Sequence, residues 1–202
     1  MVSYRLCCKM DFNYREKGEI QMLWQSKGPE NTDATVQAAL KRATELNIKH
    51  IVVASNSGRT ATLFLNKGFD IVWVTHHVGF AGPGECEVEP GYKEQLQKGG
   101  VKMLTTTHLL AGVDRAVRLK FGGLYPGEIV SSALRLFGQG PKVCVEISVM
   151  ALDAGLIPFG EEVVTVGGSG RGADTACVIL PSHSNTFFDT KVKEIICMPR
   201  KH

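Results

Sequence analysis

The stretch IVVASNSGRTATLFL, from Ile51 to Leu65, decides the fold of this chain. Its first four residues are apolar and three of them are β-branched, which predicts a buried β-strand. The polar loop Ser55-Asn56-Ser57-Gly58 follows. Residues 60–67 then predict a short helix that Gly68 can end in a left-handed conformation. A strand, a short loop and a helix in this order are typical of α/β proteins.

The same alternation continues on both sides of this stretch. Residues 28–47 predict a helix with one apolar stripe, and residues 69–76 and 101–107 predict two further strands. Alternating strands and helices imply right-handed crossovers and a parallel sheet covered by helices on both faces. Three late strands are predicted in EEVVTVGG, ADTACVIL and VKEIICMP. Because no clear helix separates them, at least one should be antiparallel.

The middle of the chain predicts three helices. The first has four apolar residues on a shared face: Leu110, Val113, Val117 and Phe121. The second begins at Pro126 and carries a further apolar stripe: Val130, Ala133, Leu134 and Phe137. The third begins at Pro141 and is apolar almost all round, so we expect a central, covered helix. Lys142 and Glu146 lie four residues apart on it and predict an exposed ion pair rather than catalytic groups.

Composition limits the class of protein. The chain has 202 residues and a net charge of +3 without any long block of like charges, which does not suggest nucleic-acid binding. No apolar run approaches the roughly 20 residues of a membrane span. The polar residues 1–22 predict an N-terminal lead-in rather than a secretory signal, and residues 23–202 predict a single domain. Six cysteines without Cys-x-x-Cys or zinc spacing favour a cytoplasmic protein with neither disulfides nor a metal site.

The loop after the first strand has the composition of an anion site. Unpaired amides and the dipole at a helix start attract a phosphate, and a glycine lets the backbone approach it closely. The candidate ligand residues are Ser55, Asn56, Ser57, Gly58, Arg59 and Thr60. The alternative is that Ser, Asn and Gly only cap the helix. The loop is not a Walker loop, because the Gly-x-x-x-x-Gly-Lys-Ser/Thr spacing is absent.

IVVASNSGRTATLFLNKGFDIVWVTHH resembles the C-terminal domain of pyruvate kinase, where a Thr-Lys-Ser-Gly-Arg-Ser/Thr loop holds a phosphate of the allosteric sugar bisphosphate. Ser55 and Asn56 replace the Thr and Lys of that motif, which favours a monoester over a bisphosphate. The segments GPENT, GGLYPGEIV, RLFGQGPKVCVEI and FFDTKVKEII extend the resemblance, over residues 28–200, to a mostly archaeal stand-alone family. The resemblance implies a three-layer α/β/α sandwich with one antiparallel strand, and flavin mononucleotide (FMN) as cofactor.

A second Ser-Gly-Arg lies in VVTVGGSGRGADTACVIL. Gly168, Gly170 and Ala173 match the letters of a dinucleotide fingerprint, but the extended run that follows does not predict the helix which that fingerprint needs. The loop is either a plain connection between strands or a nest of amides for an anion or a flavin ring. The family cofactor favours the nest. Its candidate residues are Gly167, Gly168, Ser169 and Gly170, with Asp174 as a partner for a ribityl hydroxyl.

Two further polar runs end the second and third predicted strands, and they contribute the candidates Thr75, His76, Thr105 and Thr106. They can line the same cleft as the first loop, or simply cap the segments that follow. His76 and His77 would point to opposite faces as strand residues, which argues against a paired metal site. No local pattern supports Ser-His-Asp or Cys-His catalysis.

We therefore expect a cytoplasmic FMN-binding protein, with flavin redox chemistry if it is an enzyme. The alternatives are a non-catalytic regulatory module that senses a sugar phosphate or nucleotide, and a phosphosugar enzyme. A pyruvate kinase is not expected, because its catalytic barrel alone needs roughly 250 residues. The expected partner is a small phosphate-bearing ligand rather than nucleic acid or a membrane, and a homo-oligomer is compatible with the sequence.

Overall fold

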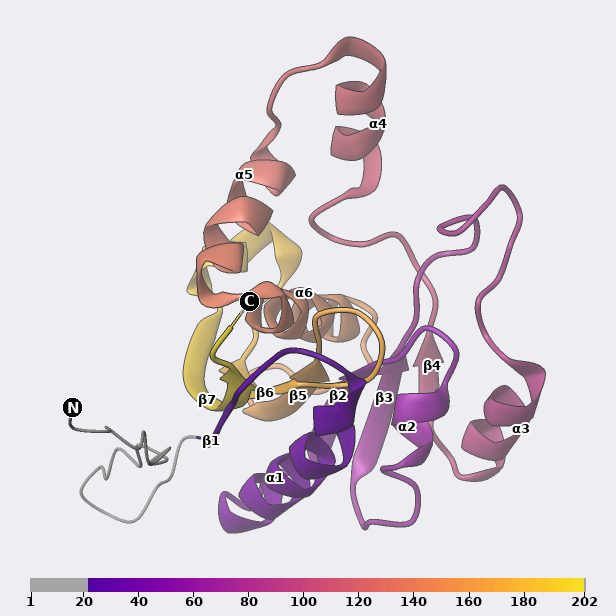
Figure 1. The fold of residues 1–202 in the computed structure, drawn as a ribbon, viewed down its shortest axis with the longest axis vertical. Coiled ribbons are helices and arrows are strands. Elements are labelled where there is room, and N and C mark those ends of the chain that lie inside the picture. The colour runs from indigo at the N-terminus through magenta and orange to yellow at the C-terminus, as the bar shows by residue number, and fades with distance from the viewer. Residues whose placement is uncertain (1–21, 202) are drawn as a thin grey trace, which may run out of the picture.

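The structure is a computed structural model that describes residues 22–201. The predicted lead-in lies outside this range except for Met22. Seven strands form one sheet in the order β1-β7-β6-β5-β2-β3-β4 (Figure 1). The strands are β1 (Met22–Trp24), β2 (His50–Ala54), β3 (Asp70–Val74), β4 (Lys102–Leu104), β5 (Val163–Gly167), β6 (Thr175–Leu180) and β7 (Lys191–Pro199).

Six α-helices and three short 3₁₀ helices connect the strands of this range. The α-helices are α1 (Thr32–Glu45), α2 (Arg59–Thr62), α3 (Pro90–Lys98), α4 (Gly112–Phe121), α5 (Pro126–Leu134) and α6 (Gln139–Asp153). The 3₁₀ helices are η1 (Pro29–Asn31), η2 (Arg135–Phe137) and η3 (Ser184–Asp189). Within residues 22–201, no helix is both long and apolar enough to cross a bilayer.

The predicted α/β sandwich is confirmed. β6 runs antiparallel to both of its neighbours, and every other strand pair in the sheet is parallel. Successive residues of β2 point to opposite faces, so Ile51 and Val53 pack in the core beneath α1 while Val52 packs against α6. The two helices thus cover opposite faces (Figure 1), and twelve residues of α6 are buried, as its all-round apolar pattern predicts.

The helix after the first loop is shorter than predicted. α2 ends at Thr62, and the next amides bond three residues back instead of four: Phe64 N to Ala61 O and Leu65 N to Thr62 O. The chain therefore tightens into 3₁₀-type turns. Asn66, with φ of 57°, takes up the left-handed conformation before Gly68 does.

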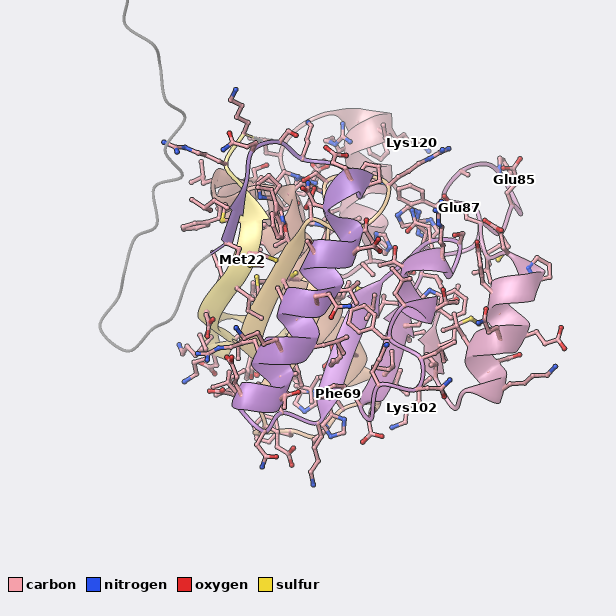
Figure 2. All side chains as sticks on the ribbon, turned by 60° about the horizontal axis from the view of Figure 1, so that its bottom comes forward. Met22, Phe69, Glu85, Glu87, Lys102 and Lys120 are labelled. Carbon is pink, nitrogen blue, oxygen red and sulfur yellow. The ribbon has the colours of Figure 1, made fainter. Side chains whose placement is uncertain are left out.

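The sheet order creates a topological switch point. From β2 the chain proceeds outward through β3 to β4, and then returns to the other side of β2 as β5. In open α/β sheets, ligands bind beyond the carboxyl ends of the strands at such a point. Both Ser-Gly-Arg loops follow the strands that flank it. Figure 2 shows the direction of the strands, with Phe69 and Lys102 at their amino ends and Glu85 and Glu87 beyond their carboxyl ends.

Candidate functional site

The carboxyl ends of four parallel strands meet at one edge and bring the predicted candidates together. Val53 of β2 pairs with Val166 of β5, so the loops that follow these strands start side by side. On the other side, the hydroxyls of Thr75 and Thr105 lie 2.7 Å apart after β3 and β4. The candidates assembled at this edge are Ser55, Asn56, Ser57, Gly58, Arg59, Thr60, Thr75, His76, Thr105, Thr106, Gly167, Gly168, Ser169 and Gly170.

The first loop is held by its own hydroxyls. Ser55 Oγ accepts a hydrogen bond from Thr60 N at 3.2 Å, and Ser57 Oγ accepts one from Arg59 N at 3.3 Å. The buried Trp73 indole donates to the carbonyl of Ser55. Because α2 has only four residues and its first amides are occupied, the predicted contribution of the helix dipole is small. The serine O–H groups keep their protons and can still donate to a ligand.

The surroundings of the loop require a glycine at position 58 and leave the Arg59 side chain exposed. Gly58 has φ of 104°, and a Cβ there would lie 2.9 Å from Tyr92 Cβ and 3.1 Å from the Trp73 ring, so packing alone requires glycine. Arg59 is exposed, and within residues 22–201 no ion pair or hydrogen bond involves its guanidinium. The loop therefore presents hydroxyls and one available positive charge.

The second loop is anchored by Asp174, which is 1% exposed. Its carboxylate accepts hydrogen bonds from Gly28 N at 3.3 Å, Ser169 N at 3.2 Å and Thr175 Oγ1 at 2.9 Å. These bonds tie the loop to the segment before α1. Since Thr175 already starts β6, no helix follows the glycines, as the sequence predicts. Gly170 at the loop tip is exposed with open space around it.

A cavity of about 430 Å³ lies beside the first loop. It is lined mainly by apolar side chains: Val78, Cys86, Val88, Pro90, Lys93, Met103 and Thr105. Glu89, between two of these lining residues, donates its backbone N–H to Ser57 O at 3.0 Å. That hydrogen bond fixes the cavity wall to the first loop. The volume falls within the range of roughly 300–1,000 Å³ that is usual for small-molecule sites.

Three histidines gather near the same edge, although His76 and His77 were expected to point to opposite faces as strand residues. β3 ends at Val74, so strand alternation no longer separates them. Their ring centroids lie 5.2 and 5.8 Å from that of His108. The His76 ring stacks on Phe80 at 3.7 Å, and its Nδ1 lies 2.5 Å from Glu87 Oε2. No group within residues 22–201 is arranged to hold a metal ion.

The predicted exposed ion pair on α6 is buried. Lys142 and Glu146 are 8% and 4% exposed at their side chains, and Glu146 also accepts a hydrogen bond from Leu110 N at 2.9 Å. The four-residue spacing correctly predicted that the two side chains pair. Spacing alone does not show that the segment after β4, which contains Leu110, covers this side of α6. Burial lowers the pKa of the nearby His108, against the opposing effect of the Glu146 charge. This shift favours the neutral form of the His108 imidazole.

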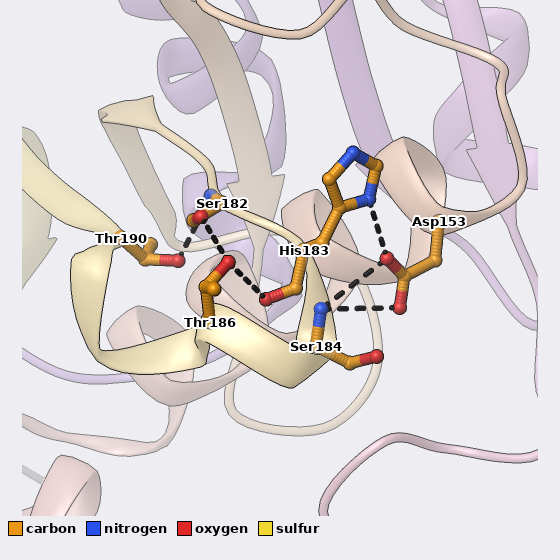
Figure 3. Close-up of polar contacts among 6 residues, drawn as sticks. All are labelled: Asp153, Ser182, His183, Ser184, Thr186 and Thr190. Atoms are coloured by element: carbon orange, nitrogen blue, oxygen red, sulfur yellow. Dashed lines mark hydrogen bonds and ion pairs between the residues drawn. The ribbon is translucent and has the colours of Figure 1, made fainter.

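A further polar cluster resembles a Ser-His-Asp arrangement only in composition (Figure 3). His183 Nδ1 lies 2.8 Å from Asp153 Oδ1, and Ser184 N donates to the same carboxylate. Burial raises the pKa of Asp153, but hydrogen bonds from Ser184 and His183 outweigh it and lower the value. Ser182 Oγ pairs with Thr186 Oγ1 at 2.7 Å instead of with the imidazole. The cluster fixes the end of α6 to η3 and is not a catalytic triad.

The chain is similar to part of the pyruvate kinases. Two crystal structures of Cryptosporidium parvum pyruvate kinase, one of them in complex with ADP, align with 73% and 67% of the chain at 18% and 19% identity and TM-scores of 0.38 and 0.34. The aligned part is only 23% and 20% of those pyruvate kinases. The family model described as "Pyruvate kinase, alpha/beta domain" matches residues 33–179, from α1 to β6. The chain belongs to the pyruvate kinase α/β domain family.

Proposed function

We propose that this protein binds a small phosphate monoester with a flat apolar moiety, of which FMN is the leading candidate, at the carboxyl edge of the sheet. The proposal rests on the position of the cavity, whose wall is hydrogen-bonded to the first loop. A polar loop with an available arginine lies one hydrogen bond, Glu89 N to Ser57 O, from a largely apolar cavity of about 430 Å³. A ligand with a charged end and an apolar end matches that arrangement.

The phosphate end would be held by the first loop. The O–H groups of Ser55 and Ser57 can donate hydrogen bonds to a phosphate. Their oxygens already accept hydrogen bonds from the backbone amides of Thr60 and Arg59, and these bonds orient the two side chains. Arg59 supplies the charge, and guanidinium is well suited to phosphate oxygens. The second loop, one strand away, would contribute backbone amides only.

The ring end would occupy the cavity, whose residues fit a flavin. Apolar side chains suit an isoalloxazine, and Lys93 is the charged residue among those lining the cavity. When bound, FMN would supply hydride and single-electron chemistry. The His108 ring lies 5.2 Å from that of His76 and could exchange a proton near this site, and the Glu87 carboxylate holds His76 in place. A flavin-dependent oxidoreductase is the class of enzyme that these groups would serve.

A non-catalytic module that senses a sugar phosphate is the second candidate. Arg59, which has no ion pair within residues 22–201, and the loop hydroxyls would serve any phosphate monoester. The cavity favours the flavin over the sugar. Sugar hydroxyls need polar partners, and most residues lining the cavity are apolar.

Titration of the full chain with FMN, riboflavin and glucose 6-phosphate distinguishes these functions. Arg59→Gln should weaken FMN binding by about 10–100-fold, the value of one charge-assisted hydrogen bond of roughly 1.5–3 kcal/mol. Arg171→Gln is the matched control, because it alters the same tripeptide in the second loop. Riboflavin, which lacks the phosphate, should bind equally to both variants and to the parent chain.

Alkylation of Cys86 provides a second readout. This thiol is exposed and lines the cavity, so bound FMN should slow its reaction with iodoacetamide. Absence of FMN binding to the folded chain at millimolar concentration, together with thermal stabilisation by glucose 6-phosphate, would establish the sensor instead. FMN binding that Arg171→Gln weakens and Arg59→Gln does not would move the phosphate to the second loop.

A further inference from the structure

Residues 77–88, which we call the lid loop, make up most of the long connection between β3 and α3 (Figure 1). From His76 to Gly91 no residue is buried, so no side chain of this loop is anchored in the core. Three of the seven residues that line the cavity nevertheless belong to it: Val78, Cys86 and Val88. The lid loop is therefore a wall of the cavity that the core does not hold, as is typical of segments that open locally.

The tip of the lid loop is closed on itself. Its backbone makes three short-range hydrogen bonds: Phe80 N donates to His77 O at 3.2 Å, Glu85 N to Gly82 O at 2.9 Å, and Gly79 N to Glu85 O at 2.8 Å. Donor and acceptor of each bond lie within the loop. The tip can therefore move as one unit without losing these bonds.

Two side chains of the lid loop contact His76, which directly precedes it. Glu87 Oε2 lies 2.5 Å from His76 Nδ1, and the Phe80 ring stacks on the His76 ring at 3.7 Å. The Phe80 ring also lies 5.7 Å from the His108 ring and 5.9 Å from the Arg115 guanidinium. The polar contact between His76 and Glu87 thus spans the loop, from the residue before it to a residue near its end.

Both ends of the lid loop are fixed to the body of the protein. Thr75 N donates to Leu104 O of β4 at 2.9 Å, and Glu89 N donates to Ser57 O of the first loop at 3.0 Å. A segment that is fixed at both ends and not buried between them can swing without disturbing the sheet. Such a movement would carry three lining residues away from the cavity and leave the first loop in place.

We propose that residues 77–88 are a lid over the cavity, and that the contact between His76 and Glu87 holds this lid closed. The identity of the ligand rests on the proposed function, but the lid itself rests only on the cavity and its wall. Release of a ligand has to wait until the lid opens. Loss of the His76–Glu87 contact should therefore open the lid more often and release the ligand faster.

Proteolysis of the ligand-free full chain tests the lid directly. Chymotrypsin cleavage after Phe80, read by peptide mass, reports how often the loop opens, because native cleavage follows the open population. Glu87→Ala should speed this cleavage by about 10-fold, the effect of losing one hydrogen bond to a charged group. The midpoint of urea unfolding should stay unchanged, which separates local opening from loss of the fold.

Glu85→Ala is the matched control, because it removes the same charge from the same loop. Figure 2 labels both glutamates, and no ion pair within residues 22–201 involves Glu85. This variant should be cleaved at the rate of the parent chain. Equal cleavage after Phe80 in Glu87→Ala and Glu85→Ala would overturn the proposal, since it would mean that the contact with His76 does not hold the loop.

Stopped-flow fluorescence with FMN tests the effect on the ligand. Glu87→Ala should raise the dissociation rate constant by about 10-fold without lowering the association rate constant, because a looser lid does not obstruct entry. Glu85→Ala should change neither rate constant. An unchanged dissociation rate constant in Glu87→Ala would overturn the lid as a gate. Faster cleavage of Glu87→Ala in a chain that binds no FMN would support the lid and refute the proposed ligand.

Discussion

The buried ion pair on α6 offers a sharp test of the packing under the site. Lys142 and Glu146 are both under a tenth exposed, and Glu146 also accepts the Leu110 amide. Glu146→Gln keeps the size of the side chain and an oxygen for that amide, but it removes the charge that neutralises Lys142. Breaking a buried pair in this way typically costs about 3–5 kcal/mol, because an uncompensated charge is left in the interior.

Urea unfolding of the full chain measures this loss. A cost of this size should lower the free energy of unfolding by a large part of the roughly 5–15 kcal/mol that is usual for a domain. Glu94 and Lys98 on α3 form the matched control, because they are the same residue types at the same spacing with side chains 69% and 75% exposed. Glu94→Gln should cost no more than about 0.5 kcal/mol.

The comparison of the two variants decides whether burial or spacing determines the value of the pair. Equal losses, both below about 1 kcal/mol, would refute the reasoning, because they would mean that the uncompensated charge of Lys142 reaches water without penalty. Lys142→Met combined with Glu146→Leu should recover most of the stability, since an apolar pair of similar volume removes both charges together.

Three further perturbations follow from single contacts. Gly140→Ala should cost at least about 1–3 kcal/mol in urea unfolding, since its Cβ would lie 1.9 Å from Thr175 Oγ1. Native iodoacetamide labelling, read by peptide mass, should modify Cys86 and spare Cys197, because burial raises the pKa of Cys197 to about 12; equal labelling would contradict this. Burial lowers the pKa of His108, so the unfolded chain binds more protons just below about pH 6.5. Stability should therefore fall as the pH drops through that window, and His108→Gln should flatten the decline measured by thermal unfolding.

Much of the sheet could be predicted because its signals are local. The β-branched run at residues 51–53 and the turn-rich spacing of the last three strands specify strands whatever the rest of the chain does. The order of the strands at the switch point then places both Ser-Gly-Arg loops at one edge. The exposure of Lys142 and Glu146 could not be read in the same way, because the cover over α6 comes from a segment more than thirty residues earlier.

The histidine group shows a different limit of pattern reasoning. A period of two holds only while the backbone remains extended, and β3 stops one residue before Thr75. The turn that follows brings His76 and His77 towards His108. The signal in the sequence was the repeated Thr-His ending of two adjacent parallel strands, which must lie at the same edge once the strands pair.

α4 meets the proposed ligand site through one contact. The Arg115 guanidinium of α4 lies 5.9 Å from the centre of the Phe80 ring, and that ring stacks on His76. α4 has no buried residue of its own, so little else fixes α4 at this point. We therefore expect Arg115→Gln to bind FMN more weakly than the parent chain, because the Phe80 ring that stacks on His76 loses a cation–π neighbour. Equal affinity of the two proteins in fluorescence titrations would show that α4 does not support the ligand site.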